Sequence, residues 1–443
     1  MAQVASAGGW DTSLTVVNLG TSSADVSLSF FDESGNPLSL PFSFPQGSIN
    51  PTTTPTVTSS IKPNGLLLLD TTGSVKQAAA VGWSLLQTAG GVDGYAMFTN
   101  KPNNWQAVVP LETRNASSYL LAFDNTGSLN TGLAIANLST KAVNVTVIIR
   151  NDSGAPIGTE AIALPALGHV SFMLNSAYPI TTGMRGTVEF DTPTGGQINV
   201  LGLRANGPAL TTVPVLAQVS ANGGSMAHVT FNGGWHTTFT LVNTGTSSAQ
   251  ATLDFFDDNG NPLQMPLLFP QTGAASRSTA VTPTLAAGSS LIIETNGDDS
   301  SDSVSGSAQL MTTGKVSGFA IFRYNRSNQE AVVPLETRNA SSYTLVFDNT
   351  DGVATGLAVA NESMQSTTLN LILRNDSGAQ IGTATVPLPA HGHTAQVLSQ
   401  AYGATAGIRG TVEIDAPTGI QFSALGIRFT PSQNVTTIPV LVK

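Results

Sequence analysis

The sequence repeats itself, and this duplication constrains the fold more than any other feature. The thirteen letters AVVPLETRNASSY occupy residues 107–119 and return unaltered at residues 331–343. The match is wider than this, because GGWDTSLTVVNLGTSSADVSLSFFDESGNPL from residue 8 resembles GGWHTTFTLVNTGTSSAQATLDFFDDNGNPL from residue 233. A repeat of this length predicts that the two halves of the chain fold alike.

Each half divides again. LTVVNLGTSSADVSLSFFDESGNPL from residue 14 resembles LAIANLSTKAVNVTVIIRNDSGAPI from residue 133, with an Asn and a turn Gly in register. A segment of about 100 residues is the size of one β-sandwich domain. We therefore predict four tandem domains in the order A-B-A-B, namely A1 (residues 1–113), B1 (114–219), A2 (226–337) and B2 (338–443).

The dominant pattern inside each repeat has a period of two. Segments such as DVSLSFF, VNVTVII and RGTVEF alternate apolar and polar residues and are separated by turn clusters such as ESGNP and NDSGAP. This pattern predicts short strands joined by turns. One short helical turn is expected at NSAYPITTG and at SQAYGATAG. The fold class is therefore all-β, with immunoglobulin-like β-sandwich domains, although a jelly roll would give similar spacing.

The stretch that occurs twice is predicted to be a joint between domains. Residues 108–111 read as the last strand of A1, and residues 118–124 read as the first strand of B1. Charged residues two apart on an extended segment share one face, so they are expected to form surface ion pairs that fix the angle between domains. These junction residues are Glu112 with Arg114 and Glu336 with Arg338. The same reading pairs Arg185 with Glu189, and Arg409 with Glu413.

Composition excludes several classes of function. Only 10% of the residues are charged, the net charge is −10, and there is no basic cluster for a nucleic acid backbone. The absence of cysteine excludes disulfides and thiolate sites. The longest strongly apolar run, LLLL at residues 66–69, is far shorter than the ~20 residues of a membrane-spanning helix, so no membrane span is expected.

Catalytic and metal motifs are weak. The sequence has no G-x-S-x-G, and its histidines read as turn or surface residues. They are His169, His228, His236, His391 and His393. No cofactor is expected apart from a weak calcium candidate at Asp257, Asn259 and Asn261, where oxygen side chains alternate. A glycine-containing hairpin turn explains the same letters. The chain is accordingly expected not to be an enzyme.

Two kinds of residue point to carbohydrate. Trp10 and Trp235 follow paired glycines and are candidates for stacking on a sugar, although each ring can equally cap a sandwich core. N-x-S/T triplets mark candidate glycosylation sites in an exported protein. They include Asn115, Asn137, Asn144, Asn339, Asn361 and Asn434.

The pattern of four repeats, carried by EAVVPLETRNASSY and GTVEFDTPTGGQINVLGLRAN, resembles uncharacterised secreted bacterial proteins built from tandem immunoglobulin-like β-sandwich repeats. The resemblance implies export and an extracellular or cell-surface role, and it carries no catalytic residues. The first residues, MAQVASAGGW, lack the pattern of a signal peptide. The predicted function is structural, with an adhesin or carbohydrate-binding surface protein as the alternative.

The ends of the chain suggest how such a protein would assemble. The joint between B1 and A2 reads TTVPVLAQVS followed by ANGGSMAHVTFNGGW, and the two termini resemble that joint cut open. We expect copies to associate head-to-tail through terminal strands into a homopolymer. Deleting residues 1–9 is expected to abolish assembly while each domain stays folded.

Overall fold

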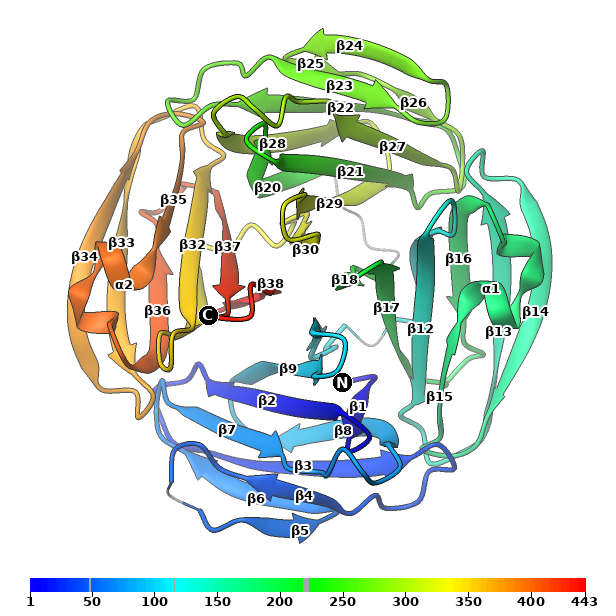
Figure 1. The fold of residues 1–443 in the computed structure, drawn as a ribbon, viewed down its shortest axis with the longest axis vertical. Coiled ribbons are helices and arrows are strands. Elements are labelled where there is room, and N and C mark those ends of the chain that lie inside the picture. Colours follow the sequence, from blue (N-terminus) through cyan, green and yellow to red (C-terminus); the bar gives the residue numbers. More distant parts are fainter. Residues whose placement is uncertain (48, 115, 218–222) are drawn as a thin grey trace. The chain divides into compact units, whose positions relative to one another are not determined.

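The computed structural model describes residues 1–47, 49–114, 116–217 and 223–443. Regular structure is nearly all β, which confirms the all-β part of the predicted fold class (Figure 1). The two predicted helical turns are also confirmed. Each is one short α-helix followed by a 3-10 turn, and the elements are α1 (Leu174–Ala177), η1 (Pro179–Thr181), α2 (Leu398–Ala401) and η2 (Gly403–Thr405).

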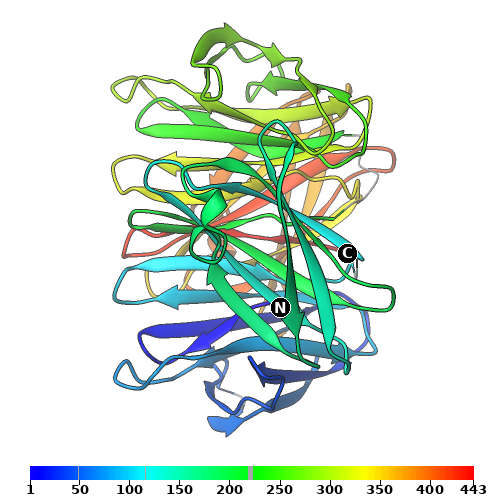
Figure 2. The ribbon, with the colours of Figure 1, turned by 90° about the vertical axis from the view of Figure 1, so that its right-hand side faces the viewer.

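Repeat A1 forms two antiparallel sheets, with strand orders β1-β8-β3-β6 and β10-β9-β2-β7-β4-β5. Their alternating burial, as in β3, follows the period-two pattern of the sequence. The strands appear as stacked layers in the side view of Figure 2, coloured blue. They are β1 (Val4–Ser6), β2 (Trp10–Asn18), β3 (Ala24–Asp32), β4 (Leu40–Ser43), β5 (Thr52–Thr54), β6 (Thr56–Ile61), β7 (Leu66–Thr71), β8 (Ala80–Thr88), β9 (Val92–Asn100) and β10 (Trp105–Pro110).

Repeat A2 has the same two sheets, in the orders β20-β28-β22-β25 and β24-β23-β27-β21-β29-β30, with β26 also pairing β22. Its strands are β20 (Gly223–Phe231), β21 (Trp235–Asn243), β22 (Ala249–Phe256), β23 (Met265–Phe269), β24 (Ala274–Ser278), β25 (Ala280–Val281), β26 (Thr284–Leu285), β27 (Ser290–Thr295), β28 (Val304–Thr312), β29 (Val316–Tyr324) and β30 (Gln329–Pro334).

Among the described residues of the B repeats there is no counterpart of the β4–β5 hairpin. In B1 the sheets are β14-β13-β16-β11-β19 and β15-β12-β17-β18, and in B2 they are β34-β33-β36-β31-β39 and β35-β32-β37-β38. The strands are β11 (Ser118–Asp124), β12 (Leu129–Asn137), β13 (Val143–Asn151), β14 (Pro156–Leu164), β15 (His169–Met173), β16 (Arg185–Asp191), β17 (Ile198–Asn206), β18 (Ala209–Val213), β19 (Leu216–Ala217), β31 (Ser342–Asp348), β32 (Ala354–Asn361), β33 (Thr367–Asn375), β34 (Gln380–Leu388), β35 (His393–Val397), β36 (Arg409–Asp415), β37 (Phe422–Phe429), β38 (Val435–Ile438) and β39 (Val440–Val442).

The order of the strands corrects the immunoglobulin-like prediction. An immunoglobulin domain pairs its strands as ABED and CFG. The first eight strands of A1 instead pair as 1-8-3-6 and 2-7-4-5, which is the order of a jelly roll, with β9 and β10 added beside β2. Alternating hydrophobicity identifies strands but does not say which strands pair, and so the sequence left both topologies open.

The chain separates into two compact units. Unit 1 is Met1–Ile149, Pro156–Ala217 and Asp376–Ala379, and unit 2 is Arg150–Ala155, Gln218–Asn375 and Gln380–Lys443. One apolar core in unit 1 joins A1 residues to Leu201 and Leu210 of B1. Within each unit the A and B repeats therefore share core, and four separately folding domains with the predicted boundaries stay a prediction.

The first residues of the chain belong to the sandwich of A1. Met1 and Ala2 are buried, β1 pairs with β8, and the Thr12 hydroxyl donates to the Ala5 carbonyl over 2.6 Å. At the other end, β39 pairs with β31 inside B2. Deleting residues 1–9 would remove core side chains from A1, which corrects the expectation that every domain stays folded without them.

A buried asparagine closes each of the four sandwiches at the end of its second strand. Asn361 is fully buried, and its amide nitrogen donates to the carbonyls of Gln365 and Pro389, both over 2.7 Å. Its side-chain oxygen accepts from the Ser363 amide over 3.0 Å. The same pattern of two carbonyl acceptors and one amide donor recurs at Asn18, Asn137 and Asn243.

Replacing this asparagine should destabilise unit 2. Asn361→Ala leaves two carbonyls and one amide without their partner, and we expect a loss of about 2 kcal/mol or more in the free energy of unfolding. Urea unfolding followed by circular dichroism measures it. Asn144→Ala, at an exposed position of β13, is the control and should change stability by less than about 0.5 kcal/mol. Equal stability of the two variants would show that the asparagine is not needed.

Candidate functional site

In unit 2, the contact between A2 and B2 gathers three titratable side chains. The hairpin turn after β22 packs against the turn before β35, and a Cβ at Gly260 would collide with the Ala390 carbonyl oxygen. This close approach, with a φ of +81°, explains the glycine there. The His393 amide donates to the Asp258 carbonyl over 3.2 Å. The turn therefore brings Asp258 beside the first residue of β35.

Asp258, His393 and His228 form a chain of hydrogen bonds. Oδ1 of Asp258 lies 2.8 Å from Nδ1 of His393, and Nε2 of His393 lies 3.1 Å from Nδ1 of His228 on β20. A carboxylate only accepts, so His393 donates from Nδ1 to Asp258, and one hydrogen lies between Nε2 of His393 and Nδ1 of His228. The two rings lie 5.1 Å apart, and the His393 side chain is fully buried.

The surroundings of His228 and Asp258 shift the pKa of both side chains. Loss of water, together with the neighbouring His393, lowers the pKa of His228 to about 3, so this ring is neutral near pH 7. The hydrogen bond from His393 lowers the pKa of Asp258 below its ordinary value. The arrangement is one carboxylate and two imidazoles in a row, which sequence reading had treated as separate turn and surface residues.

Unit 1 carries a different version of the same contact. His169 replaces His393, and its Nε2 lies 3.0 Å from Oε1 of Gln3, which occupies the position of His228. The His169 amide donates to the Glu33 carbonyl over 3.0 Å, but Nδ1 of His169 is buried without a hydrogen-bond partner. Burial lowers the pKa of His169 to about 4. Unit 1 thus keeps the backbone contact and lacks the second imidazole.

The junction residues pair as predicted, but not as surface pairs, because the side chains of Glu112 and Glu336 are only 7% and 6% exposed. Nε of Arg114 lies 2.9 Å from Oε1 of Glu112, and its Nη1 donates to the Val215 carbonyl in the last part of B1 over 3.1 Å. The guanidinium also lies over the ring of Tyr119, 5.7 Å from its centroid. Glu336 and Arg338 repeat these contacts in unit 2. Each pair ties the A–B linker to the end of its B repeat, at Val215 just before β19 and at Val440 in β39.

A second carboxyl lies beside this junction in B2. Glu362 is partly buried, and burial together with the nearby Glu336 raises the pKa of Glu362 from 4.5 to about 7. Leu138 occupies the equivalent position in B1. Ionisation of the Glu362 carboxyl therefore lowers the stability of the folded protein.

Replacing Glu362 by leucine should stabilise unit 2 in a pH-dependent way. The raised pKa means that the folded state holds a proton between about pH 4.5 and 7 that the unfolded state has lost, so the native protein loses stability as pH rises through that window. Glu362→Leu removes this loss, and we expect a gain of about 1–2 kcal/mol at pH 8 and little change at pH 4. Urea unfolding at both pH values measures it, with Glu160→Leu at an exposed position of β14 as control. A gain that is equal at both pH values would contradict the explanation.

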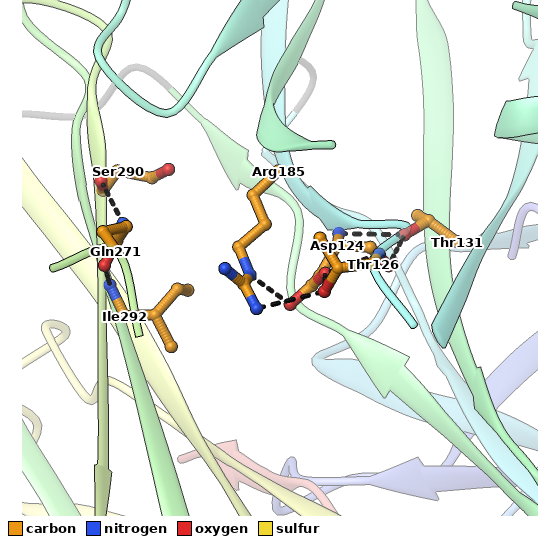
Figure 3. A network of polar contacts seen from close by, with 7 residues as sticks. All are labelled: Asp124, Thr126, Thr131, Arg185, Gln271, Ser290 and Ile292. Atoms are coloured by element: carbon orange, nitrogen blue, oxygen red, sulfur yellow. Dashed lines mark hydrogen bonds and ion pairs between the residues drawn. The ribbon is translucent and has the colours of Figure 1, made fainter. Parts of the chain in front are cut away.

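Arg185 and Arg409 do not pair with the glutamates predicted for them. Nε of Arg185 lies 2.9 Å from Oδ2 of Asp124, its direct partner across β11 and β16 (Figure 3). Arg409 likewise pairs with Asp348 at 3.2 Å. Residues four apart on a strand are far more widely separated than cross-strand neighbours, which explains the difference. Figure 3 also shows Gln271 bridging the backbone of Ser290 and Ile292 within A2.

The aromatic candidates are partly buried and packed against other rings. Trp10 lies 5.4 Å from Phe98, measured between ring centroids. Trp235 lies 5.5 Å from Phe322 and 4.6 Å from Tyr324, and the exposed Arg326 sits over Tyr324 at 5.9 Å. Only the A2 repeat has this added ring and cation, because Asn100 and Pro102 take their places in A1.

The calcium candidates close the hairpin turn that contacts B2. Oδ1 of Asp257 accepts from the amides of Asn259 and Asn261 over 2.9 and 2.8 Å, and the Asn261 side chain donates to Oδ2 over 3.2 Å. Within residues 1–47, 49–114, 116–217 and 223–443, no group of three or more His, Cys, Asp or Glu side chains is placed to hold a metal ion. No helix in these ranges is long and apolar enough to cross a membrane.

The candidate glycosylation sites fall into two classes. Asn137, Asn361 and Asn434 are buried, and the first two donate to backbone carbonyls, so these side chains are not accessible in the folded chain. Asn144 and Asn339 are exposed. Asn115 lies outside the described residues.

Comparison with known proteins identifies no family. No family model matches the chain, and no curated protein matches it. One similar solved structure is dimeric latent PorU from Porphyromonas gingivalis (8% identity, 80% of this chain, TM-score 0.12), of which the chain spans only 31%. Another is a family 32 glycoside hydrolase from Bifidobacterium adolescentis (8% identity, 99% of this chain, 100% of that chain, TM-score 0.13). Likenesses this low carry no argument about function.

Proposed function

We propose that this chain is a non-enzymatic extracellular structural protein that self-assembles into a filament, surface layer or matrix. The supporting observation is that charged and imidazole side chains lie at the contacts between A and B repeats. Asp258, His228 and His393 join A2 to B2, and the Glu112–Arg114 pair ties the A1–B1 linker to B1. Side chains that would serve catalysis are used to join sandwiches. The resemblance to secreted tandem-repeat proteins agrees with this proposal.

Exposed sheet edges supply the surface for assembly. The edge strand β6 has exposed Thr56, Thr58 and Ser60 and carries no charge. A shallow depression lined by residues of β3, β6 and β8 lies beside it. An uncharged edge offers backbone groups to a strand of another copy, and the low charge of the whole chain weakens repulsion between copies. Because β1 and β39 pair within their own repeats, assembly is assigned to such edges rather than to exchange of the terminal strands.

Charge placed on β6 should prevent assembly. The experiment is negative-stain electron microscopy of the wild type and of a variant carrying Thr56→Lys and Thr58→Lys, near neutral pH. We expect ordered filaments or sheets from the wild type and dispersed particles from the variant, with similar urea unfolding for both, because like charges on an edge repel. Ser153→Lys, which adds a charge at an exposed turn outside β6, is the control. Dispersed wild-type particles at every concentration would overturn the proposed self-assembly.

A second candidate function is carbohydrate adhesion, favoured by the Trp235–Tyr324 pair with Arg326 beside it. Aromatic faces stack on sugars, and a nearby guanidinium and carboxylate hydrogen-bond to hydroxyls. Asp299 supplies the carboxylate, 3.0 Å from Nε2 of His236, and is exposed.

Binding to insoluble polysaccharide tests this candidate. Trp235→Ala should reduce retention of the protein in a pull-down at least tenfold, because the ring supplies the stacking face. Trp10→Ala, which changes the equivalent ring of a repeat that lacks the tyrosine and the arginine, should leave retention unchanged. Equal losses in both variants would point to lost folding, and no retention of the wild type would remove the candidate.

A further inference from the structure

The contact between His228 and His393 has the geometry of a pair of metal ligands. Their facing nitrogens lie 3.1 Å apart. Two imidazole nitrogens bound to one tetrahedral Zn²⁺, at about 2.0–2.1 Å each, lie about 3.3 Å apart. The rings come from β20 and β35. Their nitrogens would have to separate by only a few tenths of an ångström to reach the spacing of two zinc ligands.

We propose that His228 and His393 bind one divalent transition metal ion of the Zn²⁺ class and thereby cross-link repeats A2 and B2. The ion replaces the hydrogen between the two rings. For binding, Nε2 of His393 and Nδ1 of His228 each present a lone pair to the ion. The hydrogen that lay between them moves to Nε2 of His228 or to solvent.

Asp258 prepares His393 for this role. Its carboxylate accepts from Nδ1 of His393 over 2.8 Å, which holds the proton on the nitrogen that faces away from the ion. A carboxylate behind a metal-bound histidine orients the ring and makes the ligating nitrogen more basic. Asp258 is exposed on its outer side and His228 is partly buried, whereas the His393 side chain is fully buried.

The site supplies two protein ligands, and water completes the coordination. No third His, Cys, Asp or Glu among the described residues is placed to join them. We therefore expect weaker binding than at a structural zinc site with four protein ligands. Unit 1 supplies the natural comparison, because Gln3 occupies the position of His228 and the Nδ1 of His169 has no carboxylate partner.

Titration calorimetry with ZnCl₂ on the untagged full chain tests the proposal. We expect one saturable site in the wild type and at least tenfold weaker binding in His228→Gln, which copies unit 1 and should fold. His236→Gln changes the surface histidine that pairs with Asp299 and should leave the affinity unchanged. Zn²⁺ should also raise the unfolding temperature of the wild type but not that of His228→Gln.

Asp258→Asn keeps both imidazoles and provides a second test. It should weaken zinc binding about 10–100-fold, the usual effect of losing such a partner. This variant decides the question if His228→Gln fails to fold, because unchanged affinity in Asp258→Asn would then overturn the proposal. So would the absence of saturable binding by the wild type, full binding by a folded His228→Gln, or a loss of binding in His236→Gln.

Discussion

The buried asparagine at the end of the second strand is the interaction on which each sandwich depends. Asn18 ends β2 in one sheet, and its amide nitrogen donates to the Ile61 carbonyl at the end of β6 in the other sheet, over 2.9 Å. A second donation reaches the Ser22 carbonyl over 2.8 Å, in the connection that crosses between the sheets. One side chain therefore satisfies backbone groups at the place where the jelly roll turns back on itself, and no apolar residue could do so.

The contacts of the duplicated A–B linker are the same in both units. The contacts of Arg114 with Glu112 and Val215 recur in unit 2 with nearly the same distances. The sequence identity across this stretch thus coincides with the same contacts of the arginine, the glutamate and the tyrosine in both units.

Strands, turns, the joint and its ion pairs could be read from the sequence because each is local. Strand order could not, since period two describes the faces of a strand and not its neighbours. Asn137 and Asn361 illustrate the same limit. Their register across the repeats was visible, yet an N-x-S/T triplet says nothing about burial, so they were read as glycan acceptors. His228 and Asp258 lie thirty residues apart in the sequence. The only sign that they belong together is that both differ from the residues at the equivalent positions of A1, Gln3 and Glu33.

At the A–B contact the two units differ in side chains but share the backbone conformation of the turn. In unit 1 the indole of Trp83 donates to the Leu167 carbonyl over 2.7 Å and stacks on Phe31. In unit 2 His391 takes the place of Leu167 and stacks on Phe256 at 4.6 Å. The turn keeps the same left-handed backbone at both positions, with φ of +55° and +54°. The turn at the A–B contact therefore keeps the same backbone conformation in both units, although the side chains on it differ: an indole meets the turn carbonyl in unit 1, and an imidazole stacks on a phenyl ring in unit 2.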